Sequence, residues 1–488
     1  MQNESYDMLI QGGTVIDGSG APGYSADVLI RGENIVSIGV VDKAAISVKT
    51  IVDATGKVVT PGFIDSHAHG NPLKTPGFEN FSSMGVTTIL LGQDGDSPDN
   101  LSQWMQKMDD INPAINIGTF VGHGSVRAEA GVKLNPDPSR RDLRKMARLV
   151  KTAMQAGSFG LSTGLEYQPG SFSEMDELIA IARPVGKKNG LVTSHMRNED
   201  DDAIKESLNE LIAQGEGAKC AVNVSHMKVV YGHGAARAEE ILYQMEQARK
   251  NGTRITADIY PYQASYTGIG IVFPDWAKPP NKYDEVVKTR RAELAEYLRM
   301  RVNRRNGPEA TLLGTPPFAG KTLAQVADEL NKPFEDVLID DIGPRGASGA
   351  YFVMDTALQD RLFVDPYVMV CTDGSPTMRH PRGYGSFAKI IRYYVNEKQL
   401  LTIEEAVRKM TGLPAETLGL LQQNRGLLQV GFAADLLIFD PDSVMDKATF
   451  ENPHQMSEGF DWVIVNGSVV RADGTFTEQT PGKMLRKQ

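Results

Sequence analysis

The feature that most constrains the fold of this chain is an alternation between residues 61 and 373. Short runs rich in apolar and β-branched residues are followed by stretches with the spacing of amphipathic helices. This alternation predicts βα units, in which parallel strands are joined by crossover helices. The runs that qualify as strands are 61–65, 87–91, 115–122, 158–163, 191–195, 221–226, 254–260 and 367–373. The helical segments between them include 141–157, 173–190, 201–215 and 235–252.

Eight strands with intervening helices predict an α/β fold, a (β/α)8 barrel of the TIM type. A doubly wound sheet is the alternative. We favour the barrel because polar residues cluster where these strands end. More than 100 residues separate the last two strands, so we expect an insertion at about 270–350, before strand eight. Its Pro-rich start and the aromatic residues Tyr266, Phe273 and Trp276 suggest an excursion over the barrel mouth with an apolar wall.

Both ends of the chain have a different texture from the middle. Residues 6–56 contain short alternating runs separated by Gly, Asn and Asp, and the same pattern returns at 434–440 and 462–470. We therefore predict a small β-sandwich domain built from both termini. The expected division is 1–58 plus 417–488 for this domain and 59–416 for the barrel.

Net charge, hydropathy and cysteine content limit the kinds of partner and the cellular compartment that we expect for this protein. The formal net charge is −10 and no long Lys/Arg run occurs, which argues against nucleic acid and anionic membranes as partners. The first residues lack the features of a signal peptide, and no apolar run approaches the ~20 residues that span a bilayer. Two cysteines, Cys220 and Cys371, cannot make a disulfide framework. We expect a cytoplasmic protein whose eight histidines are the main candidates for metal ligands.

Two short motifs match known patterns without their structural context. Residues 18–23 fit the dinucleotide fingerprint G-x-G-x-x-G, but another alternating strand follows where that fingerprint requires a helix. Residues 160–164 fit the G-x-S-x-G nucleophile elbow, but the sequence LEYQPG follows instead of a helix. We interpret the first as a hairpin turn and do not expect a serine nucleophile at the second.

A group of histidines and aspartates lies at the ends of the predicted strands. His67 and His69, two residues apart, are expected on the same side at the end of strand one. Neutral imidazoles in such an arrangement can hold a divalent ion. The other members of the group are Asp94 after strand two, His195 and His226 at the ends of strands five and six, and Asp373 at the end of strand eight. Because Asp and His are rarely buried without partners, this shared position predicts a metal centre at the barrel mouth.

Several segments together resemble the amidohydrolase superfamily, and within it the D-aminoacylases, or N-acyl-D-amino-acid deacylases. They are PGFIDSHAH (61–69), TSHMRNE (193–199), SHMK (225–228), DIYPY (258–262), TDG (372–374) and HPRGYGSF (380–387). The resemblance covers nearly the whole chain. It implies a metal-dependent enzyme that removes the acyl group from a small-molecule N-acyl-D-amino acid, giving a carboxylate and a free amino acid.

The resemblance also implies roles for individual residues. His195 and His226 match the ligands of a tightly held zinc ion, and His67 and His69 match those of a second metal position. Asp373 matches the catalytic aspartate. Lys228, Tyr262 and Arg382 fall in segments that line the substrate pocket in relatives. We add His123, after strand three, as a candidate for binding the substrate carbonyl.

One departure from the family concerns the metal. Relatives usually carry a cysteine in a GNCG segment after strand two, whereas this chain has Gly92-Gln93-Asp94-Gly95. Asp94 is still an anionic ligand, but oxygen is harder than thiolate and changes the metal preference. We expect Zn²⁺, as one or two ions, with other divalent metals as alternatives.

The expected chemistry needs a metal and one carboxylate, with Asp373 as the acid and base. The substrate carboxylate calls for a cation, for which Arg382 is the first candidate and Lys228 the second. A cyclic-amide hydrolase of the hydantoinase or dihydroorotase kind is an alternative, although those relatives use a carboxylated lysine after strand four and none stands here. A non-catalytic scaffold homologue is a further alternative.

Overall fold

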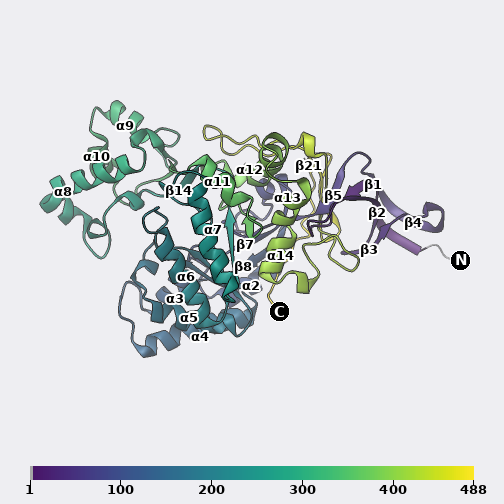
Figure 1. The fold of residues 1–488 in the computed structure, drawn as a ribbon, viewed down its shortest axis with the longest axis horizontal. Coiled ribbons are helices and arrows are strands. Elements are labelled where there is room, and N and C mark those ends of the chain that lie inside the picture. Colours follow the sequence, from purple (N-terminus) through teal and green to yellow (C-terminus); the bar gives the residue numbers. More distant parts are fainter. Residues whose placement is uncertain (1–3) are drawn as a thin grey trace.

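The structure, a computed structural model, describes residues 4–488 and has eight parallel strand positions in its centre (Figure 1). Strands β6-β7-β8 form one arc, and β9-β10-β11-β12-β13-β17 form the other. Their bounds are β6 (Phe63–Asp65), β7 (Val86–Leu91), β8 (Asn116–Thr119), β9 (Val121–Gly122), β10 (Gly160–Gly164), β11 (Leu191–His195), β12 (Ala221–Val224), β13 (Ile255–Ile259) and β17 (Val368–Val370). Strands β8 and β9 share one strand position, interrupted at Phe120.

The first and last strands also meet. An isolated parallel bridge joins Ala68 to Gly374, just beyond β6 and β17. The Asp373 amide donates to the His67 carbonyl at 2.8 Å, and the His69 amide donates to the Gly374 carbonyl at 2.8 Å. The segments that carry His67, His69 and Asp373 are therefore hydrogen-bonded to each other.

Helices follow the strands and cover the outside of the barrel (Figure 1). Helix α4 shows why the sequence folds locally in this way: Ser139 and Asp142 form a reciprocal capping box, and Gly157 ends the helix with φ of 106°. The helices outside the insertion are α1 (Glu79–Ser83), α2 (Leu101–Asp109), α3 (His123–Ala130), α4 (Arg140–Ala156), α5 (Met175–Gly186), α6 (Ile204–Ala218), α7 (Ala235–Lys250), α11 (Thr356–Phe363), α12 (Arg382–Lys389), α13 (Ile403–Met410) and α14 (Gly412–Leu418).

The two ends of the chain form one nine-stranded sheet. Antiparallel pairing of β5 with β18 joins the N-terminal strands to the C-terminal ones. The strands are β1 (Glu4–Val15), β2 (Tyr24–Arg31), β3 (Asn34–Gly39), β4 (Ile46–Asp53), β5 (Val58–Pro61), β18 (Leu436–Phe439), β19 (Phe460–Val465), β20 (Ser468–Ala472) and β21 (Thr475–Phe476). The glycine-rich segment 18–23 connects the antiparallel strands β1 and β2, so it is a hairpin connection, as we interpreted it.

Between β13 and β17 the chain leaves the barrel. The antiparallel sheet β14-β16-β15 and several helices occupy this insertion, which has a hydrophobic core of its own. The elements are β14 (Ala264–Gly268), α8 (Tyr283–Arg304), β15 (Thr311–Leu313), α9 (Leu323–Leu330), α10 (Phe334–Asp336) and β16 (Ser348–Phe352). The insertion helices and the nine-stranded sheet lie at opposite ends of the molecule, with the barrel between them (Figure 1). No helix in the described part of the chain is long and apolar enough to cross a membrane.

An aromatic cluster joins the nine-stranded sheet to the barrel. Phe63 of β6 stacks on Phe387 of α12, with ring centroids 5.8 Å apart, and meets Phe460 of β19 edge-on at the same distance. Phe439 of β18 lies 5.1 Å from Phe460. All four rings are fully buried. The strand that leads to His67 and His69 is therefore anchored at its first residue, Phe63.

We predict that Phe460→Ala lowers the free energy of unfolding by about 3–5 kcal/mol, because the substitution leaves a cavity in this cluster. Chemical denaturation followed by circular dichroism measures the change. The control is Tyr243→Ala, an aromatic side chain on α7 that is 61% exposed and should cost less than about 0.5 kcal/mol. Equal stability losses in the two variants would contradict the anchoring role of the cluster.

Candidate metal centre

The six predicted metal and catalytic residues converge at the carboxyl ends of the barrel strands. His195 is the last residue of β11, and the others stand in the loops that begin where strands end. His67 and His69 follow β6, Asp94 follows β7, His226 follows β12 and Asp373 follows β17. These six side chains meet because each stands at or just after the carboxyl end of a barrel strand, as the sequence predicted.

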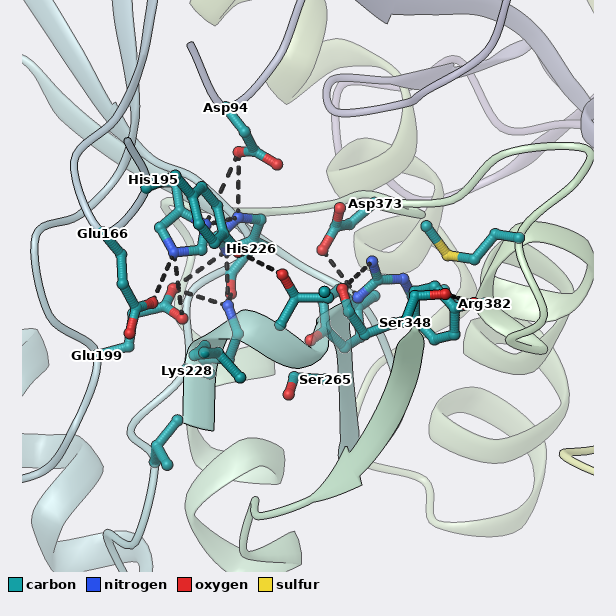
Figure 2. Close-up of a pocket in the computed structure, with 18 of the residues that line it drawn as sticks. Asp94, Glu166, His195, Glu199, His226, Lys228, Ser265, Ser348, Asp373 and Arg382 are labelled. Atoms are coloured by element: carbon teal, nitrogen blue, oxygen red, sulfur yellow. Dashed lines mark hydrogen bonds and ion pairs between the residues drawn. The ribbon is translucent and has the colours of Figure 1, made fainter. Parts of the chain in front are cut away.

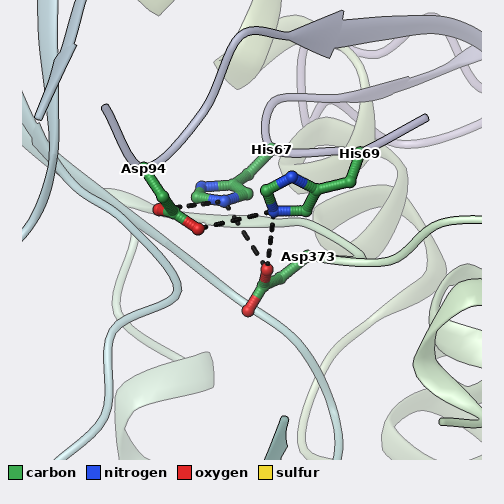
Figure 3. A group of neighbouring side chains, drawn as sticks. All are labelled: His67, His69, Asp94 and Asp373. Carbon is green, nitrogen blue, oxygen red and sulfur yellow. Dashed lines mark hydrogen bonds and ion pairs between the residues drawn. The ribbon is translucent and has the colours of Figure 1, made fainter. Parts of the chain in front are cut away.

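His67, His69, Asp94 and Asp373 form the first cluster, with their side chains pointing toward one another (Figure 3). His69 Nε2 lies 3.1 Å from Asp373 Oδ1 and 3.4 Å from Asp94 Oδ2. His67 Nε2 lies 3.4 Å from Asp94 Oδ1 and 3.6 Å from Asp373 Oδ1. Two imidazoles and two carboxylates therefore face one small volume.

Asp94, His195 and His226 form the second cluster (Figure 2). His195 Nδ1 and His226 Nε2 are 2.9 Å apart. Asp94 Oδ1 lies 3.3 Å from His226 Nε2 and 4.0 Å from His195 Nδ1. Because Asp94 belongs to both clusters, one carboxylate stands between two candidate metal positions.

Three of these side chains are aimed by unusual backbone conformations. Asp94, His226 and Asp373 adopt φ of 55°, 34° and 46°, in the left-handed region that residues other than glycine rarely occupy. Such conformations persist where the surrounding structure enforces them, and they concentrate at functional sites. Here they turn the chain just after β7, β12 and β17 and direct all three side chains into the clusters.

The electrostatics of the clusters depend on mutual stabilisation of opposite charges. Burial lowers the pKa of His69, but the hydrogen bonds to Asp373 and Asp94 outweigh it and raise this pKa to about 9. Burial would raise the pKa of Asp94, yet His67 and His226 hold it well below its usual range. Burial opposes ionisation of Asp373 too, and Arg382 next to it lowers its pKa well below the ordinary value. Both carboxylates are therefore ionised at neutral pH.

The residues present fit a divalent metal ion. His67 is fully buried, and neither of its ring nitrogens has a hydrogen-bond partner among residues 4–488. A buried polar atom without a hydrogen bond is costly, so an imidazole in this state fits the role of a metal ligand. The ligand atoms of each cluster lie within 4.8 Å of one another, which suits imidazole and carboxylate coordination of zinc.

Two glutamates outside the predicted set orient the histidines of the second cluster. His195 Nε2 lies 3.0 Å from Glu166 Oε2, and His226 Nδ1 lies 3.2 Å from Glu199 Oε1 (Figure 2). A metal-ligating histidine usually donates its other ring N–H to a carboxylate, which fixes the ring and its tautomer. Glu166 therefore leaves His195 Nδ1 free to face Asp94, and the contacts of His226 Nδ1 with Glu199 and Lys228 turn His226 Nε2 toward Asp94.

Two buried aspartates at strand ends also support the clusters. Asp258 Oδ1 accepts from the His226 amide at 2.7 Å. Asp65 accepts from the Thr372 hydroxyl at 2.6 Å and from the His67 amide at 3.2 Å. Sequence reasoning missed these residues and the two glutamates, although Asp65, Glu199 and Asp258 stand inside the segments PGFIDSHAH, TSHMRNE and DIYPY.

A cavity of about 260 Å³ opens beside the clusters. Of the four residues predicted to bind substrate, Lys228 and Arg382 line it. Arg382 Nη1 lies 2.8 Å from Asp373 Oδ2, and its guanidinium stacks over the Tyr260 ring. Lys228 Nζ donates to Glu199 Oε1 at 2.7 Å and lies at the same distance from His226 Nδ1.

The other two predicted substrate-binding residues lie away from this cavity. Tyr262 is buried against His380 and Phe450, while Tyr260 and Tyr266 line the cavity instead. His123 begins helix α3, and its Nε2 lies 2.7 Å from Glu177 Oε1. Tyr262 and His123 therefore pack in the protein around the site and do not line the cavity.

Comparison with known proteins agrees with this geometry. The model of the amidohydrolase family matches residues 50–333 and 367–471. N-acyl-D-glutamate deacylase of Alcaligenes xylosoxydans xylosoxydans is 34% identical to this chain, and the match covers 99% of this chain and 97% of the relative. D-aminoacylase of the same organism is 32% identical, and the match covers 99% of this chain and 98% of the relative. The crystal structure of N-acyl-D-glutamate deacylase from Bordetella bronchiseptica, complexed with zinc and a phosphonate mimic of the tetrahedral intermediate, matches with a TM-score of 0.84. Its identity is 33%, and the match covers 99% of this chain and 100% of that one.

The barrel with converging strand-end histidines and aspartates defines an amidohydrolase-type hydrolase. The chain belongs to the amidohydrolase family, and within it to the D-aminoacylase branch. The resemblance seen in the sequence and the predicted barrel fold are thereby confirmed.

We predict that Asp94→Asn weakens zinc binding by at least ~10–100-fold, the loss seen even for residues that only support a metal ligand. The reason is that the amide removes the negative charge that both clusters share. Zinc content after dialysis against metal-buffered solution measures the effect.

Two matched variants accompany this measurement. Asp94→Cys restores an anionic ligand and should retain zinc. Asp99→Asn changes an exposed aspartate five residues away and should bind zinc like the parent protein. Unchanged zinc content in Asp94→Asn would remove Asp94 from the ligand set.

Proposed function

We propose that this enzyme hydrolyses the linear amide bond of N-acyl-D-amino acids, giving a carboxylate and a free D-amino acid. The observation that carries the proposal is the convergence of four histidines with Asp94 and Asp373 at the barrel mouth, beside a cavity lined by Arg382. The full-length similarity to two deacylases of N-acyl-D-amino acids supports the substrate class.

We assign the metal to the two clusters that share Asp94. His195, His226 and Asp94 would hold one zinc ion, while His67, His69 and Asp373 stand ready for a second. A zinc ion bound there supplies a Lewis acid that activates water at neutral pH and polarises the amide carbonyl.

Asp373 is the residue that moves the proton in this proposal. Its carboxylate is buried and ionised, with Oδ1 toward His69 and Oδ2 toward Arg382. An ionised carboxylate at this place can accept a proton from the attacking water and return it to the departing nitrogen. When Asp373 transfers this proton to the amide nitrogen, the nitrogen can leave as a neutral amine and the C–N bond breaks.

Arg382 and Lys228 bind the substrate's α-carboxylate in this proposal. Arg382 begins α12, and its amide donates to His380 Nδ1 at 3.0 Å. His380 Nε2 in turn donates to the Ala264 carbonyl at 3.0 Å, so a neutral histidine fixes the start of the helix. A guanidinium held in this way can bind a carboxylate through two parallel hydrogen bonds.

The geometry gives no support to the cyclic-amide alternative. Strand β10 ends at Gly164, and the side chain that reaches His195 from the following loop is Glu166. A carboxylated lysine has no counterpart at this place. The scaffold alternative is disfavoured too, because all six metal and catalytic candidates converge.

The cytoplasmic location and a small-molecule partner belong to the same proposal. Cys220 and Cys371 are buried free thiols, which suits a reducing compartment. A cavity of about 260 Å³ suits a substrate the size of an acylated amino acid and excludes a folded protein or nucleic acid from the clusters.

We predict that the zinc-loaded protein hydrolyses N-acetyl-D-amino acids and that a chelator abolishes this activity. Release of the free amino group, followed across a panel of N-acetyl-D- and N-acetyl-L-amino acids, measures it. Re-addition of zinc should restore turnover of the D-substrates. Turnover of the cyclic amide hydantoin or dihydroorotate in place of the panel would refute the proposed substrate class.

We predict that Asp373→Asn lowers kcat by about 10²–10⁴-fold, the usual contribution of general acid–base catalysis. The amide cannot accept the proton, whereas His195, His226 and Asp94 remain to bind zinc. Steady-state kinetics and zinc analysis of the same sample separate the two effects. Full activity in this variant would show that another group carries the proton.

A further inference from the structure

The cavity beside the metal clusters contains a cation whose charge the protein does not balance. Three lysine and arginine side chains line the cavity: Lys228, Arg305 and Arg382. Lys228 pairs with Glu199, and Arg382 pairs with Asp373. No ion pair or side-chain hydrogen bond joins Arg305 to any other group in residues 4–488. Asp200 also lines the cavity, but its carboxylate forms an ion pair with Arg301, whose Nη1 lies 2.9 Å from Asp200 Oδ2.

Arg305 is also almost completely buried. It follows helix α8 of the insertion, is 2% exposed, and its Nε has no hydrogen-bond partner in the described chain. Its guanidinium lies 5.0 Å from the centre of the Tyr351 ring, which is itself fully buried. A buried charge without a partner is strongly unfavourable, so an arginine in this state indicates a ligand of opposite charge.

A second unpaired group, the Ser265 hydroxyl, lines the same cavity. Ser265 of β14 stands directly opposite Tyr351 of β16 in an antiparallel pair, so their side chains share one face of the small sheet. Ser265 lines the cavity and is buried, and its hydroxyl has no partner within residues 4–488. The insertion therefore presents a hydroxyl and a guanidinium that both neighbour Tyr351 and both line the cavity.

We propose that Arg305 and Ser265 form a subsite for a second carboxylate, so that the preferred substrates are N-acyl-D-amino acids with an acidic side chain. A guanidinium with a nearby hydroxyl is a suitable donor set for a carboxylate. This inference rests on the proposed function, because it assigns the side chain of the same substrate.

The position of the subsite selects the side chain rather than the α-carboxylate. Lys228 lies 2.7 Å from a metal-cluster histidine, and Arg382 touches Asp373. The α-carboxylate is two bonds from the scissile nitrogen, so it falls to these two cations. Ser265 lies on the far side of the cavity from Asp94 (Figure 2). An anion held on that side, away from the metal clusters, is assigned to the end of the side chain.

The test compares acids with their isosteric amides. We predict that kcat/KM of the zinc-loaded enzyme is about 10²-fold higher for N-acetyl-D-glutamate than for N-acetyl-D-glutamine, since the amide leaves the guanidinium uncompensated. The pair of N-acetyl-D-aspartate and N-acetyl-D-asparagine measures the effect of a shorter side chain. In Arg305→Met the acid-to-amide ratio should fall to near one, and in Ser265→Ala it should fall by about 10-fold.

Arg304→Met is the matched control. Arg304 precedes Arg305, is half-exposed and pairs with Asp202, so its loss should leave the acid-to-amide ratio of the parent enzyme. Thermal unfolding shows whether each variant is folded. If Arg305→Met does not fold, the ratio in Ser265→Ala decides. A parent enzyme that prefers the amides, or a ratio untouched in Arg305→Met, would overturn the subsite.

A binding measurement separates this inference from the proposed function. Calorimetry with zinc-loaded Asp373→Asn should show tighter binding of N-acetyl-D-glutamate than of N-acetyl-D-glutamine, and Arg305→Met in that background should remove the difference. If no N-acyl-D-amino acid is hydrolysed but this difference is found, the deacylase assignment fails and the subsite stands. If D-substrates are hydrolysed and neither acid binds better than its amide, the subsite fails alone.

Discussion

The arrangement of the barrel mouth depends on holding four imidazoles in fixed orientations beside two ionised carboxylates. Each requirement is met from outside the clusters. Glu166 and Glu199 contact the outer nitrogens of His195 and His226, and the backbone bonds between the ends of β6 and β17 bring His67 to Asp373. Such supporting contacts set both the affinity of a metal and the direction of its ligands.

The metal clusters and the proposed side-chain subsite come from two different parts of the chain, the barrel and the insertion. The ends of the parallel strands and the loops that follow them supply every side chain of the metal clusters. The aromatic cluster around Phe63 ties the first strand to the nine-stranded sheet. The insertion supplies Ser265 and Arg305, which line the same cavity. Reaction type and side-chain preference can therefore vary independently, as is common when loops on a barrel determine specificity.

Sequence reasoning found the residues whose position follows from strand periodicity. His195 ends a strand as expected, and the predicted strands lie close to the observed ones. It could not find Arg305, because a charged residue after a long polar helix normally faces solvent, and only the packing of the insertion buries it. Glu166 was missed because its approach to His195 depends on the turn after β10. The domain boundaries inferred from sequence texture remain predictions.

The central claim is that Asp94 joins His195 and His226 in binding zinc, in the place where the sequence resemblance implies a cysteine. Anomalous diffraction at the zinc edge from crystals grown with zinc tests it most directly. The account predicts a peak about 2.0–2.2 Å from Asp94 and from both imidazoles. A peak bound instead by Glu166, His195 and Glu199, the other group able to hold a metal, or no peak at all, would contradict it.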